Sequence, residues 1–523
     1  MLLYFNKIYS SILEFPFRWK CVVLLIFIFA FRLSFIGKGA SSTGDEFRYW
    51  HAFHGFYDLA HGNIKEAINY FYTLGGRPIL PFAYLPQFII QGVLYIGFEI
   101  DPRSTLSLTY AQIFSVLYSI LLLVIFFKIL IKAFQVEKKS ALFFTLILAA
   151  LVDNNVYVRH LYPYDVTITL WFLLWLYFDR YRNYIISGIC IVLITLIYPA
   201  YWPMSLLSIL IVLYGERQHT IPFKTFQKAY LQLFLGGIIS VTLIALMGYY
   251  SGHSMLDRTF EAGQAYLYDL YIPFDGSVSL LMNYYYKLDG ILGVLLFTLG
   301  IFGLILVIRN FITHKNINPF FLVAILIIIS LVFDEVYGRY TGQKMLYARM
   351  CKQYSPLLVI MLYYFYKQIS FSFQKIFCIV MSFLIAFNLF SFHKEFYNLY
   401  YPRDILSKTR NSTSVGFEHD LLSSGTDTTL IRYNDYQTNV HYTIPPQSKN
   451  ILSIPDSSIF VNFSYPSQVR LKWNDPFDSS GHSCIYSKPH FFSYKIYIFD
   501  CDRFNEIIKK SKFLKLYIFK MKK

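Results

Sequence analysis

The sequence SSTGDEFRYW, residues 41–50, follows the first hydrophobic segment of the chain and opens a polar, aromatic-rich loop. Two adjacent carboxylates, Asp45 and Glu46, are followed there by Arg48 and Tyr49. Carboxylates beside a low-dielectric phase are costly unless they are paired or used, so this cluster favours acid–base chemistry at a membrane face. A simpler interpretation also fits, because the Thr-x-x-Glu spacing is that of a capping box and acidic residues favour the first turn of a helix. The stretch alone leaves both interpretations open.

The composition predicts a protein that crosses a membrane many times. Of the 523 residues, 56% are hydrophobic and only 15% are charged, and apolar runs recur from Cys21 to Phe392. Runs of about 20 apolar residues are long enough to cross a bilayer. The net charge of +16 does not indicate a nucleic-acid partner, because the basic residues cluster in short loops between these runs, as membrane topology requires. We therefore expect membrane lipids around the chain and no nucleic acid.

The basic N-terminus predicts the orientation of the chain. Lys7, Arg18 and Lys20 precede the hydrophobic run Cys21–Ile36, which lacks a convincing small-residue cleavage site. This pattern is typical of a retained signal anchor with a cytoplasmic N-terminus. The loop that begins near Gly37 is then expected outside, and residues 47–62 and 64–72 of that loop have the periodicity of short amphipathic helices.

The apolar stretch Ile79–Phe98 decides on which side every later loop lies. If it spans the membrane, the basic loops that follow lie outside; if it lies along the outer surface, they lie inside. The positive-inside rule favours the second arrangement. Pro78, Pro81 and Pro86 also crowd the first half of the stretch. We therefore expect a peripheral or re-entrant helix.

With the first segment, about eleven spans are expected in total, and several are shorter than the ~20 residues that a bilayer needs. Short spans beside polar loops predict a cavity that opens to the outer face. The informative outer loops are expected at Asp153–Asp165, Ser251–Gly290 and Asp334–Lys352. The later spans are expected at residues 106–131, 141–152, 166–178, 184–198, 203–214, 229–250, 291–308, 320–333, 354–366 and 376–392.

The composition changes at His393, where hydrophobic runs shorten and Ser, Asp, Asn and Thr become more frequent. Residues 458–463, 494–499 and 513–519 have the pattern of strands. We expect residues 393–523 to form a small outer α/β or mostly β domain after a transmembrane catalytic domain at 1–392, whose first outer loop covers 37–104. Cys484 and Cys501 could pair there if the compartment is oxidising.

A second acidic site is predicted in the sequence RHLYPYD, residues 159–165. Asp165 directly precedes the short span that begins at Val166, so capping of that helix is the simpler interpretation. Two carboxylate sites far apart in sequence and both on the outer face favour a shared function instead. Arg77, on the same face, can contact a phosphate.

Together these features resemble the GT-C glycosyltransferases, membrane-embedded enzymes that use a polyprenyl-phosphate sugar donor. Protein O-mannosyltransferases and lipid-A aminoarabinose transferases belong to this group. The resemblance rests on residues 45–49 after the first span, the Arg77-Pro78 pair, residues 97–103 before a long span, and Tyr164-Asp165 before a short one. It covers residues 26–178; beyond them only the layout of spans and loops agrees. It implies an all-α polytopic protein of a bacterial inner membrane, with its site on the periplasmic side.

The resemblance also implies roles for individual residues. Asp45 would be the catalytic carboxylate with Glu46 beside it, Asp165 would help to arrange the site, and Arg77 would hold the donor phosphate. Further candidates for phosphate contacts are Arg159, Arg258, Arg339, Lys344 and Arg349, for each of which a surface charge is the simpler interpretation. Expected substrate contacts are Arg48, Tyr49, Trp50, Tyr164 and Tyr347, although interfacial aromatic belts also explain such residues.

Metal use stays open in this comparison. In some relatives an acidic residue before the basic–proline pair helps to bind a metal, and this chain has Gly76 there. No cofactor is therefore assigned, and a divalent metal is an alternative rather than an expectation.

The expected reaction is an inverting transfer of the sugar to an acceptor on the outer face. The lipid phosphate is the leaving group, so no nucleotide site is needed. One carboxylate would take the acceptor's proton, cations would stabilise the departing phosphate, and the transition state would resemble an oxocarbenium ion. The expected acceptor is a cell-surface glycan such as lipopolysaccharide O-antigen, with a protein or lipid A as alternatives.

Two other classes of protein are alternatives to a transferase. An O-antigen polymerase or ligase would concentrate polar residues in large late loops, and the acidic pair directly after the first span argues against it. A lipid-linked glycan flippase or other transporter would carry charges within its spans and an inverted repeat. Apart from Arg32, near the outer end of the first span, the expected spans carry almost no charge, and no such repeat is found.

Overall fold

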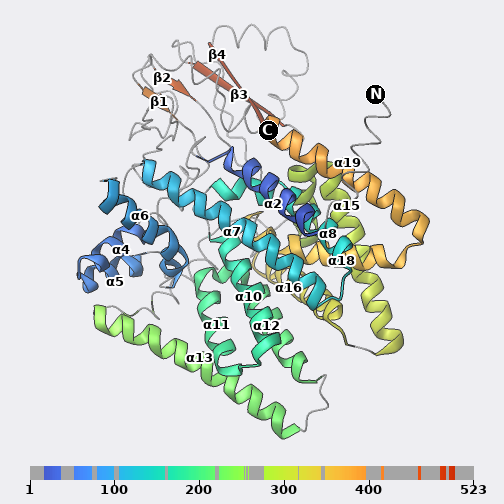
Figure 1. The fold of residues 1–523 in the computed structure, drawn as a ribbon, viewed down its shortest axis with the longest axis horizontal. Helices are drawn as coiled ribbons and strands as arrows, with labels where there is room; N and C mark the ends of the chain where they lie inside the picture. Colours follow the sequence, from blue (N-terminus) through green and yellow to red (C-terminus); the bar gives the residue numbers. More distant parts are fainter. Residues whose placement is uncertain are drawn as a thin grey trace.

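The computed structural model describes the chain in segments, and the rest of the chain lies outside them. The described residues are 17–36, 52–73, 79–98, 105–159, 163–217, 223–252, 254, 257, 276–315, 317–342, 348–395, 414–416, 458–460, 483–489 and 494–500. Most of them are helical, and the long helices pack into one bundle (Figure 1).

Each expected span falls on one helix of this bundle. These helices are α2 (Phe17–Leu33), α7 (Thr105–Lys132), α8 (Lys138–Ala150), α10 (Tyr164–Tyr181), α11 (Tyr184–Ile197), α12 (Trp202–Arg217), α13 (Phe223–Ser251), α15 (Ser277–His314), α16 (Pro319–Thr341), α18 (Tyr354–Gln368) and α19 (Phe371–Glu395).

Within the described residues, five helical segments are long and apolar enough to cross a membrane: Gln112–Lys132, Gln227–Tyr250, Leu288–His314, Pro319–Thr341 and Phe371–His393. The chain therefore has the character of an all-α membrane protein. The shorter apolar helices include Tyr164–Phe178 and Tyr184–Ile197. That all the expected spans cross the membrane stays a prediction.

Short helices follow the first span, as the amphipathic pattern predicts. They are α4 (Ala52–Ala60), α5 (Ile64–Thr73), the 3-10 helix η1 (Leu80–Tyr84) and α6 (Leu85–Phe98), and α4, α5 and α6 lie side by side at one edge of the bundle (Figure 1). An aromatic cluster joins them, in which the ring of Phe56 lies 5.2 Å from that of Phe71 and 4.8 Å from that of Phe88. The 14 residues of α6 are too few to cross a bilayer straight, which agrees with the expected peripheral or re-entrant placement.

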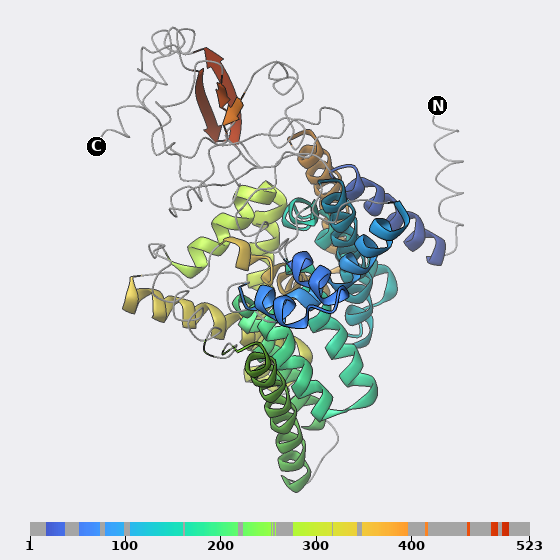
Figure 2. The same cartoon turned by 90° about the vertical axis from the view of Figure 1, so that its left-hand side faces the viewer.

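Close backbone contact joins α11 to α13, and α12 stands beside them (Figure 2). A Cβ added at Gly188 would lie 2.0 Å from the carbonyl oxygen of Leu233, and one added at Gly236 would lie 2.1 Å from that of Ile185. The hydroxyl of Ser240 crosses the same contact and donates to the carbonyl of Ile189 at 3.2 Å. Small residues that let two helices approach closely are typical of helix packing in membranes.

The helix α15 is broken at an internal glycine. Gly290 has φ 53° and ψ −127°, a conformation that residues with a side chain avoid. The break places Asp289 opposite the end of α8, where its Oδ1 accepts a 2.7 Å hydrogen bond from the backbone N–H of Val152.

Four strands are described in the C-terminal part. The strand β1 (Ser414–Gly416) pairs in parallel with β2 (Ser458–Phe460), and β3 (Ser483–Pro489) pairs antiparallel with β4 (Tyr494–Asp500). Strands β2 and β4 overlap the expected strands at 458–463 and 494–499. The expected strand 513–519 and Cys501 lie outside the described residues, so the separate domain at 393–523 and the Cys484–Cys501 pair stay predictions.

Candidate functional site

A buried ion pair links the first turn of α10 to the turn before α18. The ammonium of Lys352 lies 2.7 Å from Oδ1 of Asp165, and the two side chains are 1% and 9% exposed. Asp165 is in the first turn of α10, and Lys352 is in the turn between α17 (Ala348–Cys351) and α18. A buried ion pair is costly unless its geometry is good and its other hydrogen bonds are made, so the surroundings decide what it does.

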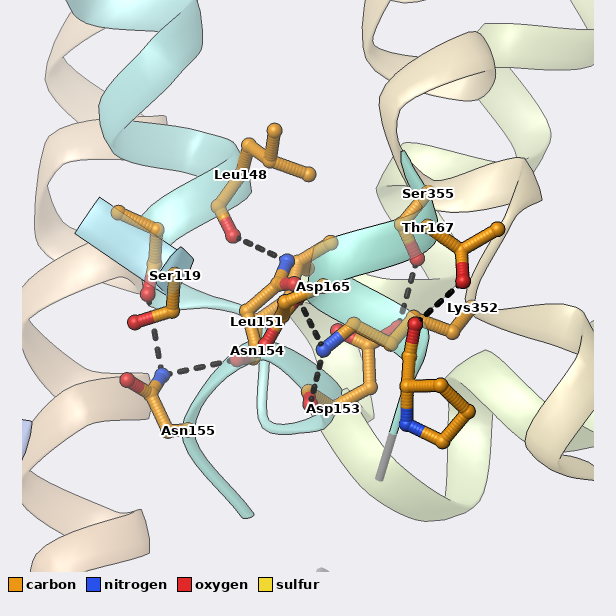
Figure 3. Close-up of polar contacts among 12 residues, drawn as sticks. Ser119, Leu148, Leu151, Asp153, Asn154, Asn155, Asp165, Thr167, Lys352 and Ser355 are labelled. Carbon is orange, nitrogen blue, oxygen red and sulfur yellow. Dashed lines mark hydrogen bonds and ion pairs between the residues drawn. The ribbon is translucent and has the colours of Figure 1, made fainter. Parts of the chain in front are cut away.

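The ammonium of Lys352 is satisfied by protein groups on several sides. It donates to the backbone carbonyl of Asp153 at 3.2 Å (Figure 3). It also lies 5.4 Å from the centre of the Tyr157 ring. Of the three N–H donors of lysine, the carboxylate and the carbonyl can accept two, and the ring face adds a cation–π contact. Lys352 therefore fixes α10 and the connection between α8 and α10 against the start of α18.

Asp153 adds a second buried carboxylate beside the ion pair. It begins the short helix α9 (Asp153–Val156), and its Oδ2 accepts hydrogen bonds from Ser355 Oγ at 2.7 Å and Tyr284 Oη at 3.3 Å. Its Oδ1 is buried and has no hydrogen-bond partner. Burial raises the pKa of the Asp153 carboxyl, and the Lys352 charge and the Ser355 hydrogen bond oppose that rise.

Side-chain amides satisfy the carbonyl groups at the end of α8. The last carbonyls of a helix have no partner within the helix, and inside a membrane protein water does not replace them. Asn154 donates to the carbonyl of Leu148 at 2.8 Å, Asn155 donates to those of Ala149 and Leu151, and Asn388 donates to that of Ala150 at 2.9 Å. This set of contacts shapes the connection that carries Asp153.

Arg32 brings a second cation to the group from the last turn of α2. Its Nε donates to Asn155 Oδ1 at 3.1 Å, and its Nη2 lies 3.4 Å from the carbonyl oxygen of Ala149. The guanidinium is close enough to Asp165 and Asp153 to interact with both electrostatically, while its Nη1 is buried and makes no hydrogen bond. Two carboxylates and two cations thus form one buried group, which we call the charged cluster: Arg32, Asp153, Asp165 and Lys352.

A separate set of polar contacts joins the start of α15 to the C-terminal part of α16. The hydroxyl of Ser277 donates to Asp334 Oδ2 at 2.6 Å, and the backbone N–H of Ser277 donates to Glu335 Oε2 at 3.1 Å. Carboxylates at a helix N-terminus are favoured by the helix dipole, so these residues cap α15. Arg339, a candidate phosphate ligand, lies 2.8 Å from Glu335 as an exposed i,i+4 pair, which favours a surface charge for that residue.

Two interpretations from the sequence are corrected by these contacts. Asp165 does not cap α10: the helix begins at Tyr164, its N-cap Pro163 makes no side-chain cap, and the Asp165 carboxylate pairs with Lys352. The expected spans at 291–308 and 320–333 are also shorter than the helices that contain them. The helices α15 and α16 extend to include Asp289 and Asp334, so these helices contain buried carboxyl groups that the expected bounds left out.

Tyr164, an expected substrate contact, is buried among other tyrosines. Its ring centre lies 5.2 Å from those of Tyr157 and Tyr198, and 6.1 Å from that of Tyr201. Only 1% of Tyr164 is exposed, so in this arrangement the ring packs the base of the α9–α10 connection.

Most of the other predicted site residues lie outside the described residues. They are Asp45, Glu46, Arg48, Tyr49, Trp50, Arg77, Arg258, Lys344 and Tyr347. Arg159 and Arg349 are placed by their backbone only, in η2 (Tyr157–Arg159) and in α17. Their predicted roles therefore stay predictions.

Sequence reasoning missed Asp153 and Lys352 as members of a site. Asp153 was expected only as the start of an outer loop, and Lys352 as the end of another. The sequence does contain one indication of this site, because the polar run Asp153-Asn154-Asn155 directly follows an apolar segment. Polar residues are costly inside a membrane and usually have a structural or functional role there. The sequence places Arg32 near the end of the first expected span but does not predict its partner.

Among the residues that the structure describes, no group of three or more His, Cys, Asp or Glu side chains has the arrangement of a metal site. No protein-family model matches the chain. A comparison with curated proteins likewise gives no significant match.

Proposed function

We propose that this protein is a membrane-embedded glycosyltransferase, which moves a sugar from a polyprenyl-phosphate donor to an acceptor at the outer face of a bacterial inner membrane. The acceptor class that we favour is a cell-surface glycan such as O-antigen. One observation carries the proposal: the charged cluster joins, through its own contacts, the chain segments from which the loops with Asp45, Arg159 and Lys344 extend.

Three loops with predicted site residues are connected in sequence to residues of the charged cluster. The loop that holds Asp45 follows α2 directly, and Arg32 lies in the last turn of that helix. Arg159 lies between Asp153 and Asp165, and the segment with Lys344, Tyr347 and Arg349 leads directly to Lys352. Every one of these loops therefore leaves the bundle beside the charged cluster.

The energetic cost of the cluster supports a functional interpretation. Buried ion pairs are weak contributors to stability, since apolar residues of similar volume often do as well or better. Ionisable residues inside membrane proteins are accordingly rare and usually mark a functional site. Here both carboxylates and both cations lie at the same end of the helices, as a site at one membrane face requires.

The chemistry follows from the residue types. A carboxylate such as Asp45 would accept the proton of the acceptor hydroxyl as that oxygen attacks the anomeric carbon. The bond from that carbon to the phosphate oxygen breaks, and basic residues such as Arg77 would stabilise the released phosphate. Asp165, held by Lys352, would keep the α9–α10 connection in place beside them.

The buried charges also give the transporter alternative a specific basis. Asp289 and Asp334 lie within long helices, as a transporter would require. Asp289, however, lies beside the break in α15, and both carboxylates accept hydrogen bonds from neighbouring elements, which favours a fixed structural role over a path through the membrane.

The test uses purified full-length protein in lipid nanodiscs and a panel of polyprenyl-phosphate hexoses. We expect release of free polyprenyl phosphate that depends on an added glycan acceptor, and none from nucleotide sugars. Turnover only of polyprenyl-diphosphate glycans would favour a polymerase or ligase. Passage of intact donor across liposomes without cleavage would favour a transporter, and either result would overturn the proposal.

A further inference from the structure

The segment from Cys351 to Ser355 is bonded to the charged cluster by side chains from several helices. Ser355 Oγ donates to Asp153 and lies 3.0 Å from the hydroxyl of Tyr285, and that hydroxyl lies 3.4 Å from the carbonyl oxygen of Cys351. Lys352 supplies the only cation in this segment, and it contacts α9, η2 and α10 at once.

The surroundings of Lys352 differ from those expected of a substrate ligand. Its ammonium lies within hydrogen-bond distance of the Asp165 carboxylate and the Asp153 carbonyl, and it lies over the Tyr157 ring, so protein groups surround it. Its side chain is also only 1% exposed. What the ammonium does control is Asp165: it is the partner that compensates this buried carboxylate and fixes its direction.

We propose that Lys352 is a positioning residue of the site, which acts through Asp165 and does not contact substrate. The inference rests on the proposed transferase function. Lys352 pairs with the Asp165 carboxylate and directs it, and through the Asp153 carbonyl it holds the α9–α10 connection against the segment that follows Lys344 and Arg349.

A kinetic double-mutant cycle tests this inference directly. The variants are Lys352→Met, Asp165→Asn and the double variant, each assayed for polyprenyl-phosphate release per folded molecule. We expect each single change to reduce the rate by about tenfold or more, the scale of a group that orients catalytic machinery. Because both residues act as one unit, the double variant should be no slower than Asp165→Asn alone.

Folding is followed separately by the native thiol of Cys351, which is buried next to Lys352. Maleimide labelling of Cys351, read by mass spectrometry, reports whether this segment is still packed. If Lys352→Met exposes Cys351, Lys352→Arg replaces it in the cycle, since it keeps the charge but changes the geometry. The expected result is then a smaller loss in the wild-type background and none in the Asp165→Asn background.

Ser208→Ala is the matched control, because it removes a buried 2.7 Å hydrogen bond from Trp175 farther along α10. It should leave the transfer rate per folded molecule unchanged. A double variant about 100-fold slower, the product of the single losses, would show that Lys352 acts independently of Asp165 and overturn the inference. A wild-type rate for folded Lys352→Met would overturn it too. After either of these results the proposed function still stands. Absence of turnover by the wild type with every donor would overturn the proposed function together with this inference.

Discussion

The side-chain amide of Asn388 donates a 2.8 Å hydrogen bond to Oδ1 of Asp289, 99 residues away in sequence. The same amide reaches the carbonyl of Ala150 at 2.9 Å, and the same carboxylate oxygen accepts from the N–H of Val152. One amide and one carboxylate thus join α19, the break in α15 and the end of α8. This junction supports the connection that carries Asp153.

Replacing Asn388 by Leu should destabilise the bundle by about 1–2 kcal/mol, because a buried carbonyl and a buried carboxylate lose a donor. The midpoint of denaturation in mixed micelles measures this change. Asn283→Leu is the control on the same helix bundle, since the Asn283 amide makes a 3.2 Å hydrogen bond at the exposed face of α15. An equal effect of both changes would contradict the importance of the junction.

Alanine substitutions at two glycines of the contact between α11 and α13 should have different effects on stability. Gly188→Ala should destabilise the protein by about 1–3 kcal/mol, because its Cβ would meet a backbone carbonyl at 2.0 Å and push the helices apart. Gly237→Ala should be neutral or stabilising, because its Cβ would meet only Val192 Cγ2 at 3.6 Å and alanine favours a helix. Thermal unfolding of both variants decides whether the two helices are as close as described.

The predicted orientation places the Asp45 loop and the C-terminal part on the same side of the membrane. Cysteines introduced at Ser42 and Ser457 should both react with an impermeant maleimide from outside. A cysteine at Lys139, which is exposed at the start of α8, should react only after permeabilisation. Labelling of Ser42→Cys and Ser457→Cys from opposite sides would refute this topology.

The sequence was sufficient to predict where the helices lie. Apolar runs must be helical in a membrane because every backbone group needs a partner, so each expected span falls on a helix of the bundle. Their ends were less predictable. The helices α15 and α16 continue past the apolar run through Asp289 and Asp334, whose carboxylates are bonded to neighbouring elements that no local pattern reveals.

The charged cluster could be predicted only in part for the same reason. Asp165 was selected, but local spacing favoured a helix cap, and its true partner Lys352 is distant in sequence. Lys352 also contacts Asp153, 199 residues away. Pairings over such separations depend on how the helices pack, which a single sequence does not specify. The Asp45 loop lies outside the described residues, so its part of the site stays a prediction.

The central claim is that Asp45 is the base of a sugar transfer from a lipid phosphate. Asn and Asp cap helices about equally well, so Asp45→Asn should keep the fold and the donor affinity. Its transfer rate should fall by roughly 10²-fold or more, the scale at which a general base contributes. Glu46→Gln, the control at the adjacent position, should lose less, and Arg77→Ala should weaken donor binding as well as turnover.

The decisive measurement is the rate of acceptor-dependent polyprenyl-phosphate release by purified wild-type and Asp45→Asn protein in nanodiscs. We predict steady release by the wild type and a loss of about two orders of magnitude in the variant, with donor binding preserved. Release at the wild-type rate by Asp45→Asn would show that Asp45 only caps a helix, and would contradict the account.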